Sequence, residues 1–465
     1  MNRSTHAPFH FQLFFFISLT LLNMGAAMPI ANAQNETIYD EAKIPAYSLP
    51  DPLVADDGTK IDTPSSWQEK RRPEILKHFK EHVFGTMPNI TGQHAVQWTA
   101  KTTSDSNVTL PVDFENPTET TVKANVREVT ITLLPKPSLN ANPEKQAAPA
   151  EPLDLHLVIF SPANTDAPLP AFLAYNFKGN HTLTELDEVA LLPVWDSRQK
   201  RLVDAQPNQR GERQSRWQVG SIINRGYALV CLNYGDVDPD FHDDFKNGAH
   251  RFFPSLQNRN DNWTSIGAWA WGLHRILDYL EKDASIDAQK TIVFGHSRLG
   301  KTALWAGATD TRIAAVISNN SGCGGAALSR RRFGESVKRI NTTFPHWFCK
   351  KHRDYNDNED ASPVDHHQLI ALIAPRPVYV ASAEDDRWAD PKGEYLSLFY
   401  ADPVFRLFGK SGVASVSNGQ PKMPQLESPI GSDVRYHIRR GKHNVTRYDW
   451  DQFLDFADHV FGNQK

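Results

Sequence analysis

From residue 155 onward, short apolar runs alternate with segments of helical periodicity. Runs rich in β-branched and aromatic residues predict seven buried strands, at residues 155–160, 171–175, 227–232, 291–294, 313–317, 378–382 and 434–438. Amphipathic stretches lie between them, and the clearest are residues 263–280 and 450–461. This alternation predicts an α/β fold, with a doubly wound, mostly parallel sheet between two layers of helices.

The first part of the chain follows a different pattern. Arg3, the apolar run 11–22 and Ala31-Asn32-Ala33 predict a signal peptide over residues 1–33, with Gln34 as the mature start. The run is too short for a membrane span, so we expect a secreted or periplasmic protein without a membrane anchor after leader cleavage. Residues 34–153 are expected to form a strand-rich N-terminal extension packed on the core domain, residues 154–465.

Composition excludes some classes of function. The formal net charge is −4, so bulk charge gives no basis for nucleic-acid binding. Three cysteines are present, and their spacing fits no zinc site. In an oxidising compartment we expect Cys323 and Cys349, both in loop-like segments, to form a disulfide, with Cys231 left as a buried thiol.

The most specific pattern is Thr-Ile-Val-Phe-Gly-His-Ser-Arg-Leu-Gly-Lys at residues 291–301. A strand, a sharp turn at Gly295, Ser297 and a helix-forming segment indicate a nucleophile elbow, which presents a serine hydroxyl at the carboxyl end of a parallel sheet. The start of the helix would stabilise an oxyanion there. The second glycine of the usual G-x-S-x-G falls one place later, at Gly300. The alternative is an ordinary β–α turn with a serine N-cap.

A serine nucleophile needs a base and an acid that orients the base. His443 follows the last predicted strand, where a sheet wound in this way carries the base. The acid is expected in the loop after strand 378–382, which contains Glu384, Asp385 and Asp386. Any of the three could orient His443 at this stage.

These residues resemble the glucuronoyl esterase family, carbohydrate esterase family 15. Gly-His-Ser-Arg-Leu-Gly-Lys is similar to its G-C-S-R-x-G-K motif, and further matches follow the family order at residues 176–181, 321–325, 333–335, 374–377 and 388–391. The resemblance implies an α/β-hydrolase with a three-layer sandwich and no cofactor. It also implies cleavage, through an acyl-enzyme, of esters that join 4-O-methyl-glucuronic acid on xylan to lignin alcohols.

Carried over residue by residue, the resemblance assigns roles at the site. Ser297 is the nucleophile and His443 the base, and Arg298 contributes its backbone N–H and guanidinium to the oxyanion hole. The family positions that hold the uronate sugar are matched by Lys301, Glu335 and Trp388. Lysine and glutamate suit sugar hydroxyls as donor and acceptor, and tryptophan offers an apolar face. The alternative for these three is a structural ion pair and a packed aromatic.

Two departures from the family pattern change the expected site. The motif cysteine is His296 here and its usual partner position is Asn444, so a disulfide common in fungal members is absent. The acid that fungal members carry before the S-G-x-G-G turn is Asn320, which cannot supply negative charge. We therefore expect the acid to be Asp386, as bacterial-type members suggest, with Glu384 in reserve.

Three functions remain open from the sequence. They are glucuronoyl ester hydrolysis, another exported carbohydrate esterase such as an acetyl-xylan esterase, and a non-catalytic binding protein with a hydrolase fold. The acidic segment 236–244 has enough carboxylates for a cation, but Pro239 and the tight spacing favour a capped loop, and we expect no metal. The expected partner is a small-molecule or polysaccharide substrate, glucuronoxylan–lignin esters above all.

Overall fold

The structure of the protein is a computed structural model that describes residues 37–88, 96–135, 151–165, 167–413, 416–417 and 420–462. The expected signal peptide, residues 1–33, lies outside the described residues. Within the described part, ten strands form one sheet in the order β1-β2-β3-β7-β4-β8-β9-β10-β14-β13. They are β1 (Val96–Pro111), β2 (Thr121–Pro135), β3 (Leu153–Pro162), β4 (Leu169–Asn176), β7 (Ala228–Asn233), β8 (Ile286–His296), β9 (Ala315–Asn319), β10 (Val378–Ala383), β13 (Ile430–Gly431) and β14 (Val434–Arg439).

The helices of the described residues connect and cover these strands. They are α1 (Pro64–Ser66), α2 (Arg72–Phe79), α3 (Gln214–Trp217), α4 (Val219–Asn224), α5 (Ser265–Leu280), α6 (Arg298–Thr309), α7 (Val337–Thr343), α8 (His366–Ala371), α9 (Pro391–Leu407) and α10 (Arg447–Phe461). Two small hairpins stand apart from the large sheet: β5 (Val194–Asp196) with β6 (Arg201–Val203), and β11 (Val416–Ser417) with β12 (Gln420–Pro421).

The predicted α/β fold is confirmed, with a sheet that is mixed. Strands β7, β4, β8, β9, β10 and β14 pair in parallel, whereas β1, β2 and β3 join them antiparallel at one edge and β13 at the other. Each of the seven strands predicted from apolar runs is present, as β3, β4, β7, β8, β9, β10 and β14.

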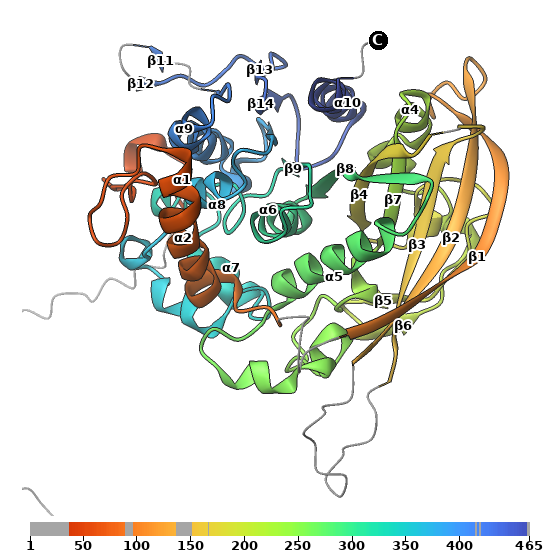
Figure 1. Cartoon of the computed structure of the whole chain (residues 1–465), viewed down its shortest axis with the longest axis horizontal. Helices are drawn as coiled ribbons and strands as arrows, with labels where there is room; N and C mark the ends of the chain where they lie inside the picture. The colour runs from red at the N-terminus through yellow and green to blue at the C-terminus, as the bar shows by residue number, and fades with distance from the viewer. Residues whose placement is uncertain are drawn as a thin grey trace, which may run out of the picture. The chain divides into compact units, whose positions relative to one another are not determined.

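Helices pack on both faces of the sheet and enclose two apolar cores (Figure 1). Helices α2, α5, α6, α8 and α9 cover one face, while α4 and α10 cover the other. Successive residues of β8 point to alternate faces, so Val293 enters the first core and Ile292 and Phe294 enter the second. A strand buried on both faces must be apolar at nearly every position, which is why this run was readable from the sequence.

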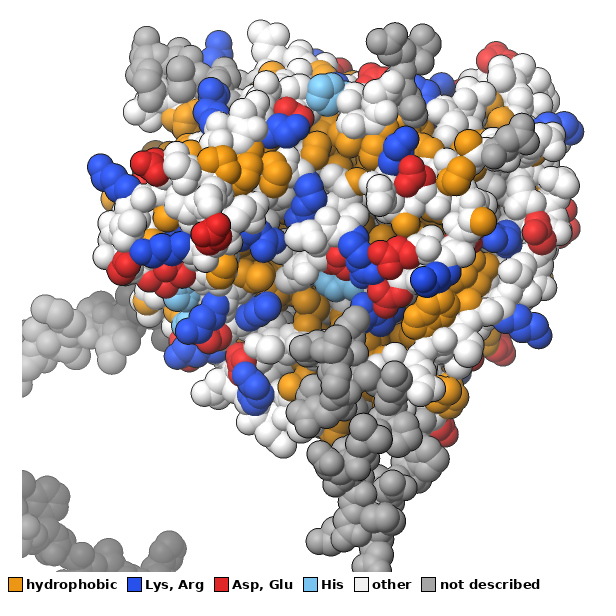
Figure 2. Space-filling view, viewed as in Figure 1, with side chains coloured by type: hydrophobic (Ala, Val, Ile, Leu, Met, Phe, Trp, Pro, Cys, Tyr) orange, Lys and Arg blue, Asp and Glu red, His pale blue; other side chains and the backbone are white. Residues whose placement is uncertain are grey.

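The long strands of the N-terminal extension, β1 and β2, belong to the same sheet as the core. β1 pairs with β2 over nearly its whole length, and β2 pairs with β3. Among the described residues, no helix has the length and apolar character needed to cross a bilayer. On the face displayed in Figure 2, basic and acidic side chains are interspersed.

The disulfide predicted between Cys323 and Cys349 is wrong. All three cysteines are free and buried. Cys349 Sγ lies 3.7 Å from the carbonyl oxygen of Glu81, whereas Cys323 is close enough to Glu335 and Lys301 to interact electrostatically with both. The two thiols therefore face different neighbours in the interior. Burial raises the pKa of each, which keeps them protonated and unreactive.

Candidate active site

Ser297 stands alone between β8, which ends at His296, and α6, which begins at Arg298. Its backbone has φ 60° and ψ −129°, a conformation that a residue with a Cβ rarely adopts and that costs on the order of 1–3 kcal/mol. The Ser297 N–H donates to the carbonyl oxygen of Asn319 on β9, 2.9 Å away. The sequence-predicted elbow is thus a strained turn at the carboxyl ends of two adjacent parallel strands.

The two glycines around the elbow have separate steric reasons. A Cβ on Gly295 would lie 1.9 Å from the carbonyl oxygen of Leu299, so the turn closes only with glycine there. A Cβ on Gly300 would lie 2.9 Å from Cβ of Ser321 and 3.0 Å from Oγ of Ser318. The displaced second glycine therefore lets the first turn of α6 pack against the segment after β9.

His443 and Asp386 form the polar contact expected of a base and its orienting acid. Nδ1 of His443 lies 2.5 Å from Oδ2 of Asp386, and Nδ2 of Asn320 donates to the same oxygen at 2.9 Å. Because a carboxylate accepts, the proton sits on Nδ1 and leaves Nε2 unprotonated. The Asp386 side chain is 6% exposed and that of His443 42% exposed, so the aspartate is shielded while the histidine reaches solvent.

The other two acids of the loop contribute their backbone to the site. The Glu384 N–H donates to the backbone carbonyl oxygen of Arg439 at 2.9 Å, and the Asp385 N–H donates to the backbone carbonyl oxygen of Gly441 at 3.0 Å. These bonds tie the loop after β10 to the turn that carries His443. Within the described residues, the carboxylates of Glu384 and Asp385 make no hydrogen bond or ion pair with that histidine.

His296 fills the position of the motif cysteine with a ring. Its centroid lies 4.5 Å from that of His443, at an interplanar angle of 39°. Nδ1 of His296 lies 2.7 Å from Oδ1 of Asn319. Burial, followed by the charge of His443, lowers the pKa of His296 well below its ordinary value, so this ring is neutral. His296 therefore supports His443 by packing.

Arg298 is held next to the elbow by an ion pair. Its guanidinium donates to Oδ2 of Asp240 and lies over Trp347, 4.8 Å from the ring centroid. Burial alone would lower the pKa of Arg298, but the charge of Asp240 raises it, so the side chain stays cationic. As the first residue of α6, Arg298 also has a backbone N–H without an intrahelical acceptor. It offers both donors that an oxyanion hole requires.

Asp240 is a site residue whose role the sequence did not reveal. Beyond Arg298, it accepts hydrogen bonds from Tyr234 at 2.9 Å, Trp347 at 2.7 Å and His346 at 2.9 Å. Despite its burial, the charge of Arg298 and the hydrogen bonds from His346 and Trp347 lower the pKa of Asp240. From the sequence, this aspartate was one of several in the acidic segment 236–244, and only its contacts through space distinguish it.

Most carboxylates of the acidic segment contact other groups of the protein. Asp236 contacts His156 at 3.2 Å, Asp238 lies 3.5 Å from His250, and Asp243 accepts from backbone N–H groups of its own loop. In the described part of the chain, one group has donor atoms close enough for a metal, within 4.8 Å of one another. It lies elsewhere and consists of His78, Glu81 and His82.

Lys301, Glu335 and Trp388 form a connected group beside the elbow. Lys301 is buried, and its ammonium donates to the carbonyl oxygen of Ser321. Burial raises the pKa of Glu335, and the charge of Lys301 opposes that shift. The Glu335 N–H donates to the Trp388 carbonyl at 3.0 Å, and the Trp388 side chain also lowers the pKa of Glu335. Trp388 is 38% exposed, which leaves its ring available to a ligand.

Glu394, which the sequence did not single out, lies under the same region. It is fully buried and accepts from Ser382 Oγ at 2.6 Å and from the Gly322 N–H at 2.9 Å. Burial raises its pKa to about 8, and the nearby charge of Asp386 adds to the shift. Its contacts link β10 to the glycine-rich turn after β9.

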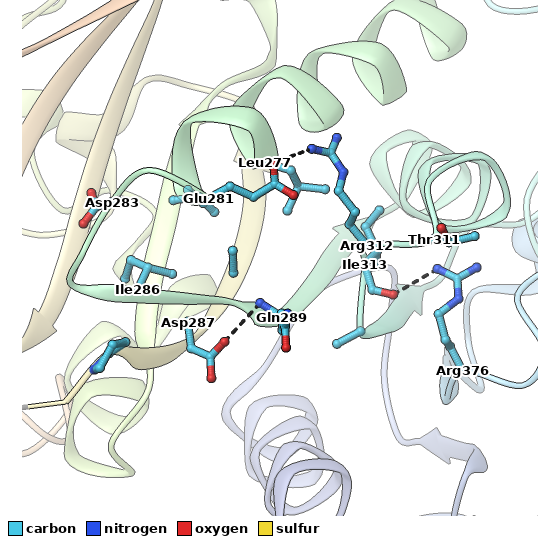
Figure 3. A pocket seen from close by; sticks show the side chains of 14 residues that line it. Leu277, Glu281, Asp283, Ile286, Asp287, Gln289, Thr311, Arg312, Ile313 and Arg376 are labelled. Carbon is cyan, nitrogen blue, oxygen red and sulfur yellow. Dashed lines mark hydrogen bonds and ion pairs between the residues drawn. The ribbon is translucent and has the colours of Figure 1, made fainter.

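A cavity of about 530 Å³ opens at the carboxyl ends of the parallel strands and is lined by Ser297, Arg298 and His443. A larger hollow of about 710 Å³ lies at the opposite ends, where β4, β8, β9 and β10 begin. Figure 3 shows that its two arginines are already engaged, Arg312 with Glu281 and Arg376 with the carbonyl of Ile313. The candidate chemistry is therefore in the smaller cavity.

Comparisons with known proteins agree on one family. A family model described as "Glucuronyl esterase, fungi" matches residues 216–409. "Carbohydrate esterase MZ0003", from an unknown prokaryotic organism, is 42% identical over 428 residues, which cover 90% of this chain and 91% of the relative. The solved structure of a glucuronoyl esterase from Solibacter usitatus has a TM-score of 0.78 at 40% identity, covering 90% of this chain and 100% of that one. The chain belongs to the glucuronoyl esterase family, carbohydrate esterase family 15.

A fungal member of the glucuronoyl esterase family matches part of the chain. "4-O-methyl-glucuronoyl methylesterase 1" from Phanerochaete chrysosporium is 35% identical over 199 residues, 41% of this chain and 42% of the relative. As a glucuronoyl esterase family member, the chain departs from the fungal pattern at His296 and Asn320. In the structure His296 packs on His443, and Asn320 donates to Asp386.

Proposed function

We propose that the protein hydrolyses 4-O-methyl-glucuronoyl esters through an acyl-enzyme on Ser297, with His443 as base and Asp386 as acid. The observation that carries the proposal is the 2.5 Å contact between His443 Nδ1 and Asp386 Oδ2 beside a serine in a strained elbow. Ser297 and His443 line one cavity, so an ester carbonyl bound there meets both nucleophile and base.

Each step of the reaction uses groups already described. Ser297 Oγ attacks the carbonyl carbon and gives its proton to His443 Nε2, and Asp386 stabilises the imidazolium. The carbonyl oxygen becomes an oxyanion that accepts from the Arg298 N–H and guanidinium. As the ester C–O bond breaks, His443 returns the proton to the departing alcohol. Water, activated by His443, then attacks the acyl-enzyme and releases the uronic acid and free Ser297.

The uronate sugar is proposed to bind at Lys301, Glu335 and Trp388. The ester has no negative charge, so its recognition depends on hydroxyls and the ring. Glu335 is a partly buried acceptor, and the partly exposed Trp388 ring provides an apolar face for the sugar. Lys301 donates to the carbonyl oxygen of Ser321, and its ammonium has further donor capacity for a sugar hydroxyl.

Natural location and substrate follow from the same proposal. Residues 1–33 are proposed to be cleaved on export, so the mature protein meets glucuronoxylan outside the cytoplasm. The natural bond is then the ester between a glucuronate side group of xylan and a lignin alcohol. N-terminal sequencing of exported protein tests the first point, and Gln34 is the expected first residue.

The central experiment compares two kinds of ester with two variants. Purified protein is assayed with methyl 4-O-methyl-glucuronate and with acetylated xylan. We expect hydrolysis of the first, and Ser297→Ala to lower kcat by about 10⁴-fold or more with an unchanged Tm. Ser428→Ala, at an exposed loop position, is the matched control. Preference for acetylated xylan, or wild-type turnover in the Ser297 variant, would contradict the proposal.

A further inference from the structure

The cavity at Ser297 has a wall that the catalytic groups do not explain. Besides Ser297, Arg298 and His443, it is built by segments 176–178 and 194–217 together with Tyr234. These segments include the β5–β6 hairpin and helix α3. At about 530 Å³, the space is in the range of cavities that enclose ring-sized ligands.

The proposed sugar-binding residues leave this cavity to the other half of the ester. Lys301, Glu335 and Trp388 form their own connected group, and none of them is among the residues that line the cavity. Both halves of an ester must reach Ser297 at once. If the uronate occupies the group around Trp388, the departing alcohol extends into the cavity.

The charged side chains of the cavity are unbalanced. Besides Arg298, which is paired with Asp240, four are basic, namely Lys178, Arg198, Arg213 and Arg216, and two are acidic, namely Asp196 and Glu212. Arg213 Nε lies 3.4 Å from Glu212. Across the described residues, Arg216 and Arg198 have no carboxylate within ion-pair distance. Burial and then the charge of Arg213 lower the pKa of Arg216, which places two like charges near each other in a half-buried site.

Aromatic rings provide the rest of the wall. Phe177 and Tyr234 meet edge to face at 5.5 Å, and Trp195 is held against Phe241 at 5.7 Å. Phe177, Tyr234 and Trp195 line the cavity and are only partly buried. Such faces suit an aromatic ring. The guanidinium group of Arg216, which has no carboxylate partner among the described residues, and that of Arg213, which has only the 3.4 Å contact with Glu212, suit a carboxylate, which arginine binds through two parallel N–H bonds.

We propose that the cavity binds the alcohol half of the ester and that Arg213 and Arg216 select aromatic alcohols carrying a carboxylate. This inference rests on the proposed function, because it assigns the alcohol of the same ester. The carboxylate would neutralise the like-charged pair, and the ring would lie against the aromatic wall. The positive potential would also concentrate anionic esters at the opening, an effect that salt screens.

The test compares three esters of 4-O-methyl-glucuronic acid: methyl, benzyl and 4-carboxybenzyl. We expect wild-type kcat/KM to be about 10-fold higher for 4-carboxybenzyl than for benzyl at low salt, a difference of about 1.4 kcal/mol. Arg216→Gln and Arg213→Gln should each bring this ratio toward one. Arg201→Gln, an equal charge change on β6 at a residue that does not line the cavity, is the matched control.

Each outcome has a separate meaning. A wild-type ratio near one, or a ratio that the Arg201 variant lowers as much as the Arg216 variant, overturns the inference while hydrolysis of the methyl ester keeps the proposed function. No hydrolysis of any of the three esters would overturn the proposed function itself. Thermal unfolding of each variant tests whether it is folded. The ratio of kcat/KM values is independent of the amount of folded protein, because both substrates are compared on the same sample.

Discussion

The Asp386 carboxylate holds both His443 and Asn320 through a single oxygen, Oδ2, at 2.5 Å and 2.9 Å. The negative charge thus comes from the loop after β10, whereas the segment after β9 contributes a neutral amide that fixes the carboxylate. A neutral donor at position 320 orients the acid without competing for the proton of the histidine.

Replacing the acid should cost far more than replacing the amide. We expect Asp386→Asn to lower kcat by about 10⁴-fold, because the imidazolium loses its negative partner and its tautomer is no longer fixed. Asn320→Ala should cost about 10-fold, since Asp386 keeps its charge. Turnover of the benzyl ester measures both effects, and equal losses would contradict the assignment.

The double variant Asp386→Asn with Asn320→Glu sharpens this prediction. A carboxylate at position 320 would lie close to His443, because the Asn320 side chain already contacts Oδ2 of Asp386, the oxygen that contacts His443 Nδ1. We expect kcat to recover by about 10-fold or more over Asp386→Asn, a gain of about 1.4 kcal/mol in transition-state stabilisation. No recovery, with the fold intact, would show that position 320 cannot direct charge at His443.

Asp240 is expected to act on catalysis through Arg298. In Asp240→Asn the guanidinium loses its charged partner, so we expect kcat to fall about 10- to 100-fold with a smaller change in KM. Asp244→Asn changes a 71% exposed side chain in the same acidic segment and is the control. Steady-state kinetics with the methyl ester distinguish the two. A purely structural role would lower Tm and leave kcat per folded molecule unchanged.

The buried Glu394 should make stability depend on pH. Burial raises its folded-state pKa to about 8 from 4.5, so the folded protein keeps a proton that the unfolded chain releases. The stabilisation from this group is therefore complete below pH 4.5 and is lost as the pH rises to about 8. Between these limits the slope is at most about 1.4 kcal/mol per pH unit.

Glu394→Gln removes that titration and keeps the shape of the side chain. We expect urea unfolding at pH 5, 6, 7 and 8 to show a flatter stability profile for the variant than for the wild type. Glu384→Gln, a partly exposed change near the same site, should leave the profile as it is in the wild type. Parallel profiles for Glu394→Gln and wild type would mean that this carboxyl is ionised throughout.

Local patterns made much of the fold and part of the site predictable. The strand at 291–294 was readable because residues buried on both faces must be apolar, and the elbow because Gly295 permits one sharp turn. The contact of Asp240 with Arg298 was not readable, because it joins residues 58 positions apart through packing that no local pattern encodes. The β5–β6 hairpin was missed for a different reason: its strands are only three residues long, too short to give a recognisable alternating pattern.

The disulfide prediction also failed because it depends on packing that the sequence does not show, and the state of the cysteines can be measured directly. Loop-like flanks and an oxidising location favoured a bridge, but the direction of each thiol depends on how the loops pack. We expect three free thiols when the protein is denatured without reductant and titrated with a thiol reagent, and almost none in the native state because all are buried. One free thiol after denaturation would restore the disulfide between Cys323 and Cys349.

The antiparallel strands at the start of the sheet also protect the protein from self-association. An open strand edge exposes unpaired backbone N–H and C=O groups that recruit strands of other molecules. Here β2 covers β3, and the outermost strand, β1, carries mainly polar side chains along most of its 16 residues. At the opposite border, β13 is only two residues long. A chain shortened to begin at residue 154 would expose the β3 edge, so residues 96–135 cover an edge that would otherwise be open to strands of other molecules.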